Sequence, residues 1–193
     1  MMKKSVLFVT CIFIFVCIGC EKNEITPSTK AELAVADCFE LVHNEERNEY
    51  EYTIMNYKGE ILIREKVEWR APTITCVDDD IIEVLRGAGT YVFACQYFNV
   101  KTSAVSDIFQ TPFFVDSGII AYYEGAQLVV RDIFNEDLFC KKFYVDMILT
   151  GPPNTVEWVK GRNALEIEYM RGVDCEIETR IFDLEDGTME LVM

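Results

Sequence analysis

Short runs rich in valine, isoleucine, phenylalanine and tyrosine recur along the chain, some of them alternating with polar residues, and glycine, asparagine, aspartate and proline interrupt them every several residues. A period of two is typical of a strand that is buried on one face, and the interruptions are typical of turns. Residues 50–56 and 60–63, joined by a Lys58-Gly59 turn, predict one hairpin, and Asp186-Gly187 marks another. Residues 39–42 predict a further strand, although residues 33–42 also fit a short helix. The pattern predicts an all-β domain.

The predicted strands recur in similar segments. Pro72, Pro112 and Pro153 stand 40 and 41 residues apart, and each is followed by a strand, a polar turn and a second strand. Proline cannot donate to a strand ladder and so favours the start of a strand, while glycine permits a left-handed turn. The predicted hairpins cover residues 73–85, 113–123 and 155–169, and Gly87, Gly125 and Gly172 close them.

A second hairpin follows each of these, marked by an aromatic residue and then a turn residue: Tyr97-Phe98-Asn99, Ile133-Phe134-Asn135 and Ile181-Phe182-Asp183. Two hairpins in about 40 residues is the size of a β-propeller blade. Residues 50–69 resemble a leading half of such a unit. The prediction is an all-β fold of antiparallel four-stranded units in a propeller-like arrangement. A curved β-sandwich or a barrel is the alternative, because such domains also place strands every ~8–12 residues.

The beginning of the chain has a different pattern. Lys3 and Lys4 precede an unbroken apolar run, residues 6–18, and Gly19 then precedes Cys20. A basic start, a short apolar centre and a small residue before a cleavage point are typical of a secretory signal peptide. The run is shorter than the ~20 residues with which a helix crosses a bilayer.

Residues 17–20, Cys-Ile-Gly-Cys, resemble the lipobox of bacterial lipoproteins, with Cys17 where leucine or valine is commoner. The resemblance implies cleavage before Cys20 and attachment of lipid to its thiol. Residues 1–19 are then the signal peptide, residues 20–32 the lipidated cysteine and a polar tether, and residues 33–193 a single β-rich domain. The expected location is extracytoplasmic, anchored by lipid to a bacterial membrane.

The chain is strongly acidic. Removal of residues 1–19 takes away Lys3, Lys4 and no acidic residue, which changes the formal net charge from −15 to −17. Such a charge repels phosphate backbones, so nucleic acid is not an expected partner. It also keeps the domain off an anionic membrane surface, which leaves the lipid on Cys20 as the expected anchor.

The cysteines do not form a recognisable metal or redox motif. Cys11 and Cys17 leave with the signal peptide and Cys20 takes the lipid, so five remain and at least one is unpaired. Their spacing contains no C-x-x-C pair, the usual mark of zinc and redox sites. The interpretation is structural thiols rather than disulfides, with Cys76, Cys95 and Cys175 buried in strands. The five are Cys38, Cys76, Cys95, Cys140 and Cys175.

No polar cluster forms a recognisable site. His43 is the only histidine, in a polar segment that predicts a turn, and no G-x-S-x-G motif accompanies it. Residues 78–80, three aspartates, and residues 132–137 lack the spacing of an EF-hand loop and predict solvated turns. The 33 acidic residues leave no carboxylate pair distinguished for glycoside hydrolysis. We predict no catalytic set, metal site or cofactor.

Aromatic residues lie on or beside the predicted strands, where they fill a core or line a groove that binds glycans or peptides; the core is the favoured interpretation. We expect a lipid-anchored binding or scaffold module of the bacterial envelope that recognises a protein or a glycan. A small envelope hydrolase that uses carboxylates is the alternative, and a purely structural component is a third possibility. The aromatic residues are Trp69, Tyr91, Tyr97, Tyr122, Tyr123, Trp158 and Tyr169.

Overall fold

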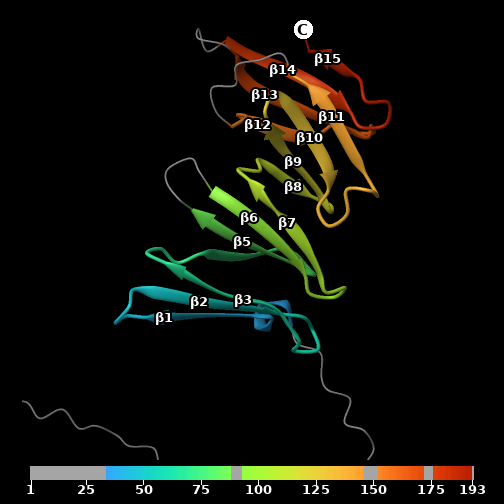
Figure 1. The fold of residues 1–193 in the computed structure, drawn as a ribbon. Helices are drawn as coiled ribbons and strands as arrows, with labels where there is room; N and C mark the ends of the chain where they lie inside the picture. Colours follow the sequence, from blue (N-terminus) through green and yellow to red (C-terminus); the bar gives the residue numbers. More distant parts are fainter. Residues whose placement is uncertain (1–33, 88–92, 146–151, 172–175, 193) are drawn as a thin grey trace, which may run out of the picture. The chain divides into compact units, whose positions relative to one another are not determined.

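The computed structural model describes residues 34–87, 93–145, 152–171 and 176–192, which all belong to one compact unit. These residues form one short 3-10 helix, Val35–Asp37, and antiparallel β-strands (Figure 1). The predicted all-β class is confirmed. The predicted signal peptide, Cys20 and the polar tether lie outside the described residues.

The first sheet contains three strands in the order β1-β2-β3. They are β1 (Phe39–Asn44), β2 (Glu49–Met55) and β3 (Ile61–Glu68). The predicted strand at residues 39–42 and the hairpin with Gly59 at its turn are therefore confirmed. The helix that residues 33–42 also fitted is limited to Val35–Asp37.

Each of the next three sheets contains four strands that follow one another in the chain. The second sheet is β4 (Thr73–Asp78), β5 (Ile81–Gly87), β6 (Phe93–Asn99) and β7 (Ala104–Gln110). The third is β8 (Phe114–Asp116), β9 (Ile119–Glu124), β10 (Gln127–Asp132) and β11 (Cys140–Tyr144). The fourth is β12 (Thr155–Trp158), β13 (Ala164–Arg171), β14 (Glu176–Asp183) and β15 (Met189–Leu191).

The three predicted repeat hairpins are all antiparallel pairs, β4–β5, β8–β9 and β12–β13. Pro72 directly precedes β4, and Pro112 lies two residues before β8. Both prolines are buried. Gly125 has a φ of 61° in the turn after β9, as expected for a closing glycine. The same expectation for Gly87 is wrong, because Gly87 remains in the ladder opposite Phe93 and has no left-handed φ. Gly172 lies outside the described residues.

One turn recurs in all four sheets and shows which strands are equivalent. An asparagine or aspartate at the end of β2, β6, β10 and β14 accepts two backbone N–H groups from the residues that follow, at 2.8 to 3.2 Å. A short side chain that satisfies these donors stabilises the turn into the next strand. The four residues are Asn56, Asn99, Asp132 and Asp183.

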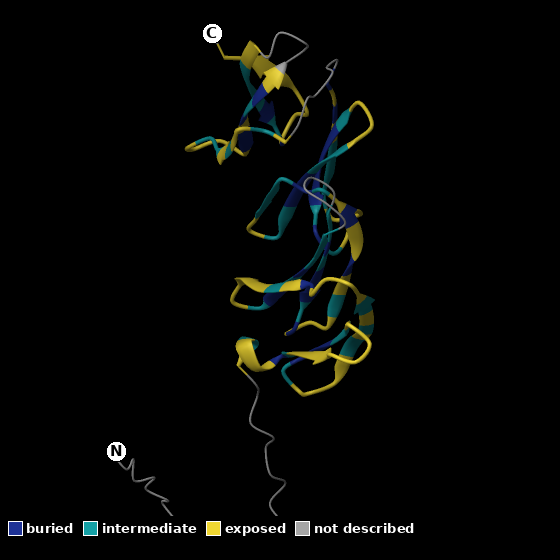
Figure 2. Ribbon diagram, turned by 90° about the vertical axis from the view of Figure 1, so that its left-hand side faces the viewer, coloured by how far each residue is buried: buried dark blue, intermediate teal, exposed yellow. Residues whose placement is uncertain are grey.

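Three hydrophobic clusters join the sheets, and each cluster contains residues of two sheets that are consecutive in the chain. The first cluster includes Tyr52 and Phe98, the second Tyr97 and Ile120, and the third Leu128 and Phe182. The second and third sheets are therefore covered on both faces, and Figure 2 shows the buried residues on their strands, with exposed residues at many connecting turns. The described strands form four separate sheets rather than the two sheets of a sandwich or one closed barrel.

The first and fourth sheets each have one polar face. In an antiparallel pair, residues directly opposite share a face. Glu157 lies opposite Glu166 on the face that points away from the third cluster, and Glu168 lies on the same face. On the first sheet, Glu51 lies opposite both Val42 and Lys66 on the corresponding outer face.

Candidate functional site

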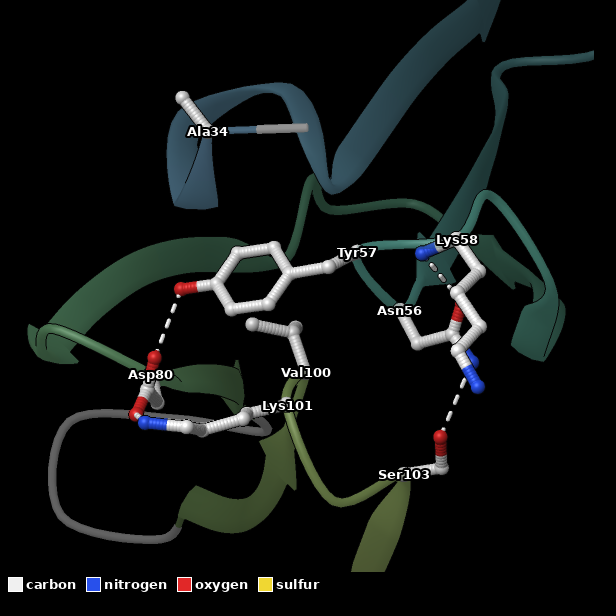
Figure 3. A pocket seen from close by; sticks show the side chains of 8 residues that line it. All are labelled: Ala34, Asn56, Tyr57, Lys58, Asp80, Val100, Lys101 and Ser103. Carbon is white, nitrogen blue, oxygen red and sulfur yellow. Dashed lines mark hydrogen bonds and ion pairs between the residues drawn. The ribbon is translucent and has the colours of Figure 1, made fainter. Parts of the chain in front are cut away.

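Two pockets of the described residues are considered as candidate sites, and the larger lies between the first and second sheets with a volume of about 410 Å³. Figure 3 shows the side chains that converge on it from three turns. These turns follow β2, join β4 to β5 and join β6 to β7. The lining residues are Ala34, Asn56, Tyr57, Lys58, Asp80, Val100, Lys101 and Ser103.

A hydrogen-bonded group forms one side of this pocket. The Tyr57 hydroxyl donates to Asp80 Oδ1 at 2.8 Å, and Lys101 Nζ donates to Asp80 Oδ2 at 3.1 Å. These two donors hold the pKa of Asp80 below its ordinary value, Tyr57 first and Lys101 second. The same bond to Asp80 raises the pKa of Tyr57 to about 12. Asp80 is therefore a fixed acceptor between the two sheets.

Asn56 forms the other side of the pocket and is 3% exposed. Its Nδ2 donates to Glu60 Oε2 at 2.6 Å and to Ser103 Oγ at 2.9 Å, while its Oδ1 accepts from the turn backbone. All the polar groups of Asn56 are thus satisfied within the protein. The polar side chains of this pocket therefore bond to one another and connect the two sheets, rather than offering unpaired groups to a ligand.

The second pocket, of about 330 Å³, lies between β7 of the second sheet and the strands β9 to β11 of the third. We call it the Tyr122 pocket. It combines aromatic, charged and amide side chains. Its lining residues are Asp107, Ile108, Phe109, Gln110, Tyr122, Tyr123, Glu124, Arg131, Glu136 and Lys142.

Arg131 organises the Tyr122 pocket. Its side chain is 7% exposed, and its Nη1 donates to Asp107 Oδ2 at 3.2 Å and to Glu136 Oε2 at 3.1 Å. The guanidinium carbon lies 5.5 Å from the centre of the Phe109 ring, close enough for a cation–π contact. Because the guanidinium is planar and held from three sides, its position in the pocket is fixed.

Tyr122 lies beside Arg131 and Phe109 in this pocket. Its ring centre lies 5.3 Å from that of Phe109. Burial raises the pKa of Tyr122, and the neighbouring Arg131 guanidinium opposes that rise. Lys142 Nζ and Glu124 Oε2 form a further pair at 3.4 Å. The pocket therefore offers aromatic surface beside planar groups that accept and donate hydrogen bonds, an arrangement that binds polar ligands with an apolar face.

His43 does not lie in a turn as predicted, because β1 extends to Asn44 and places His43 opposite Tyr50. The two rings stack with centres 4.2 Å apart. Of the three aspartates, Asp78 ends β4 and Asp80 is bound by Tyr57 and Lys101, so the segment is only partly the solvated turn that was predicted. Within the described ranges, no group of three or more histidine, cysteine, aspartate or glutamate residues is arranged to hold a metal ion.

The core interpretation of the aromatic residues is confirmed for Tyr97 and Tyr169, which are buried and donate to Glu83 at 2.8 Å and Glu178 at 2.6 Å. It is wrong for Trp69, which is 83% exposed because it lies in the connection after β3 with a φ of 74°. Trp158 is half-buried and donates to Asp116, and Tyr91 lies outside the described residues.

The four described cysteines are free thiols. Cys38 and Cys95 are buried, and burial and then Glu83 raise the pKa of Cys95 to about 12. Cys140 is half-buried. The prediction of a buried thiol is wrong for Cys76, whose edge strand leaves it exposed. Cys175 lies outside the described residues.

Tyr122 and Tyr123 were candidate residues in the sequence, whereas Arg131 and Asp107 were not recognised there. One signal was present, because Arg131 interrupts the apolar run of residues 128–130 on a strand covered on both faces. A cation in such a place requires partners. The partner Asp107 comes from another sheet, and nothing in the spacing of the two residues indicates their contact.

Comparisons with protein-family models, with curated proteins and with solved structures find no match. Among the described residues, no helix has the length and apolar character needed to cross a membrane.

Proposed function

We propose that this protein is a lipid-anchored, extracytoplasmic binding or scaffold module of the bacterial envelope. The support for the location is the basic, apolar and small-residue pattern that ends at Cys20, followed by a polar segment. Residues 21–30, which are polar and contain a proline, would serve as the connection between the lipid and the domain.

The Tyr122 pocket is the observation that carries the binding function. Burial of the Arg131 guanidinium costs desolvation free energy, and an apolar side chain of similar size would pack equally well without that cost. It holds Asp107 and Glu136 beside Tyr122, so that donors and acceptors stand next to an aromatic ring. A saccharide has both an apolar face of C–H groups and a rim of hydroxyls, and it fits this combination. We therefore propose a glycan as the ligand.

The propeller-like arrangement belongs to this proposal. The repeated unit of four strands supports it, as do the equivalent turns at Asn56, Asn99, Asp132 and Asp183. Closure of a ring would bring the outer faces of the first and fourth sheets together. The outer face of the first sheet carries Lys66 beside Glu51, and that of the fourth carries Glu157 and Glu166, so contact between the two faces would bring opposite charges together.

The hydrolase alternative has one observation in its favour. Asp107 and Glu136 contact the same nitrogen of Arg131, which makes them a close pair of carboxylates in a pocket. Both are already engaged by the guanidinium, whereas hydrolysis needs one acid that is free to give its proton to the leaving group. The arrangement favours binding.

Binding of the full chain to an array of bacterial envelope saccharides tests the proposal. We expect Tyr122→Ala to weaken the strongest signals at least about tenfold, because it removes the aromatic surface. Trp69→Ala is the matched control, since Trp69 is exposed and lies outside both pockets. Equal binding by Tyr122→Ala and the wild type, or no binding by the wild type, would reject the glycan site.

A further inference from the structure

Among the described residues, the first sheet has no counterpart of the strand that begins each of the other units. In the three complete units, the residue after the recurring turn residue donates its N–H to a carbonyl between the first two strands: Val100 to Asp80 at 2.9 Å, Ile133 to Gly118 at 3.0 Å and Leu184 to Asn163 at 2.8 Å. The equivalent N–H in the first sheet is that of Tyr57. It donates at 3.1 Å to Val100, in the second sheet.

The strands β1, β2 and β3 therefore correspond to the second, third and fourth strands of a unit. No described residue occupies the position of a first strand in this sheet. That position lies along the free edge of β1, where β4, β8 and β12 stand in the other units.

The hydrogen-bond phase of β1 shows which groups face this free edge. Met55 N donates to Cys38 O at 2.7 Å. Because bonded and non-bonded residues alternate along an antiparallel strand, Phe39, Leu41 and His43 direct their N–H and C=O groups away from β2. Edge strands offer such groups to other chains unless lysine, proline or a bulge blocks them. Residues 39–44 contain neither lysine nor proline, and β1 pairs with β2 in an uninterrupted register.

The side chains of β1 are also unusually exposed for their type. Leu41 is 43% and Val42 60% exposed. They project to opposite faces of the sheet, since neighbouring residues in a strand alternate. A strand added at this edge would cover part of both.

We propose that the missing strand is supplied by β1 of a second copy of this chain, which pairs antiparallel across a two-fold axis at Leu41. In this register the outward-facing residues lie opposite one another, as the hydrogen-bond phase requires. Leu41 meets Leu41 of the second copy, Phe39 meets His43, and Glu40 meets Val42. Aromatic pairs across strands are stabilising, and no like charges lie directly opposite.

A second copy fits better than an unrelated strand because β1 is complementary to itself in this register. The paired segments are short, so the contact is weak for free molecules. The proposed lipid anchor would confine the copies to one membrane and raise their effective concentration, and to this extent the dimer rests on the proposed function. Both copies are acidic, so added salt should strengthen the contact by screening their repulsion.

The test uses the symmetry of position 41. Full-length chains with two different C-terminal tags are co-expressed, extracted in mild detergent, captured on one tag and measured by the other. We expect the wild type to be co-captured. Leu41→Lys with itself, and Leu41→Glu with itself, should each lower co-capture at least about tenfold, because like charges meet on the axis. Leu41→Lys co-expressed with Leu41→Glu should restore it.

Ile61→Lys is the matched control, because Ile61 is 53% exposed on β3, at the opposite edge of the same sheet. It should leave co-capture unchanged. Far-UV circular dichroism of each variant shows whether it is folded, and recovery in the mixed pair cannot come from misfolded chains. Absence of co-capture in the wild type, or absence of recovery in the mixed pair, would overturn the dimer. Fatty-acid labelling of the same samples reports the anchor separately.

Discussion

Arg131 follows the three apolar residues 128–130 on β10, and its guanidinium lies against Phe109, whose ring contacts Tyr122. Its two carboxylate partners are 73% and 51% exposed, so water can solvate them if the guanidinium is removed. The methylene groups of the Arg131 side chain nevertheless fill space beside Phe109 of the second hydrophobic cluster. Charge and volume therefore contribute differently to stability at this position.

We expect Arg131→Met to change the free energy of unfolding by less than about 1 kcal/mol, since it conserves volume. Arg131→Ala should lower it by about 2–3 kcal/mol, because it leaves a cavity. Urea denaturation of both variants measures the difference. An equal loss in the two variants would mean that the charge itself stabilises the fold. A stable Arg131→Met that loses glycan binding would assign the guanidinium to the ligand.

The buried Tyr123 hydroxyl lowers the free energy of unfolding of the domain at alkaline pH. Burial raises its pKa from 10.0 to about 12. Below pH 10 the hydroxyl is protonated in both states and the contribution is complete; between pH 10 and 12 the unfolded state loses the proton first, so stability falls as the pH rises. We expect a loss of about 1 kcal/mol from pH 10 to 11 in urea denaturation, in addition to losses from other buried groups. Tyr123→Phe should show a smaller decline.

The recurring turn ties each third strand to the fourth. Asn99 Oδ1 accepts the N–H groups of Lys101 at 3.1 Å and Thr102 at 2.9 Å, and alanine removes both bonds. We expect Asn99→Ala to lower the free energy of unfolding by about 1 kcal/mol, measured by urea denaturation. Glu46→Ala, in the exposed turn after β1, is the control and should lie within about 0.5 kcal/mol of the wild type. Equal stability of the two variants would contradict this role.

Strands and turns were predictable because their signals are local. The hairpin at Gly59, the three repeated hairpins and the β1 strand follow from alternation and turn residues within a few positions of one another. The errors at His43 and Gly87 have one cause. A polar residue or a glycine is compatible with a strand end when the neighbouring strand supplies a partner, here Tyr50 and Phe93.

The candidate site was less predictable, because its parts come from different sheets. Tyr122 and Tyr123 were recognisable as candidates from their place on a strand, whereas Asp107 and Arg131 are 24 residues apart in the sequence and meet through packing of the second sheet on the third. The exposure of Trp69 likewise depends on a left-handed backbone between two sheets. Such contacts follow from tertiary arrangement rather than from local pattern.

At the scale of the whole molecule, lipidation is predicted at Cys20. Growth of a bacterial host with radiolabelled palmitate should label the wild-type chain, and Cys20→Ser should take up no label. Cys140→Ser is the control, because Cys140 is a free, half-buried thiol of the β domain and should leave labelling unchanged. Equal label in Cys20→Ser and the wild type would mean that the lipid is attached to another residue. Absence of label in the wild type would mean that the chain is not lipidated.

The three hydrophobic clusters of the described residues each connect only consecutive sheets, which has a mechanical consequence. A pull on the C-terminal sheet, resisted at the N-terminal end, passes through the clusters in series rather than in parallel. The load on every cluster is then the same, and the weakest sheet yields first while its neighbours remain folded. A protein built this way lengthens in steps under tension, and each step lowers the tension that acts on both ends of the described β domain.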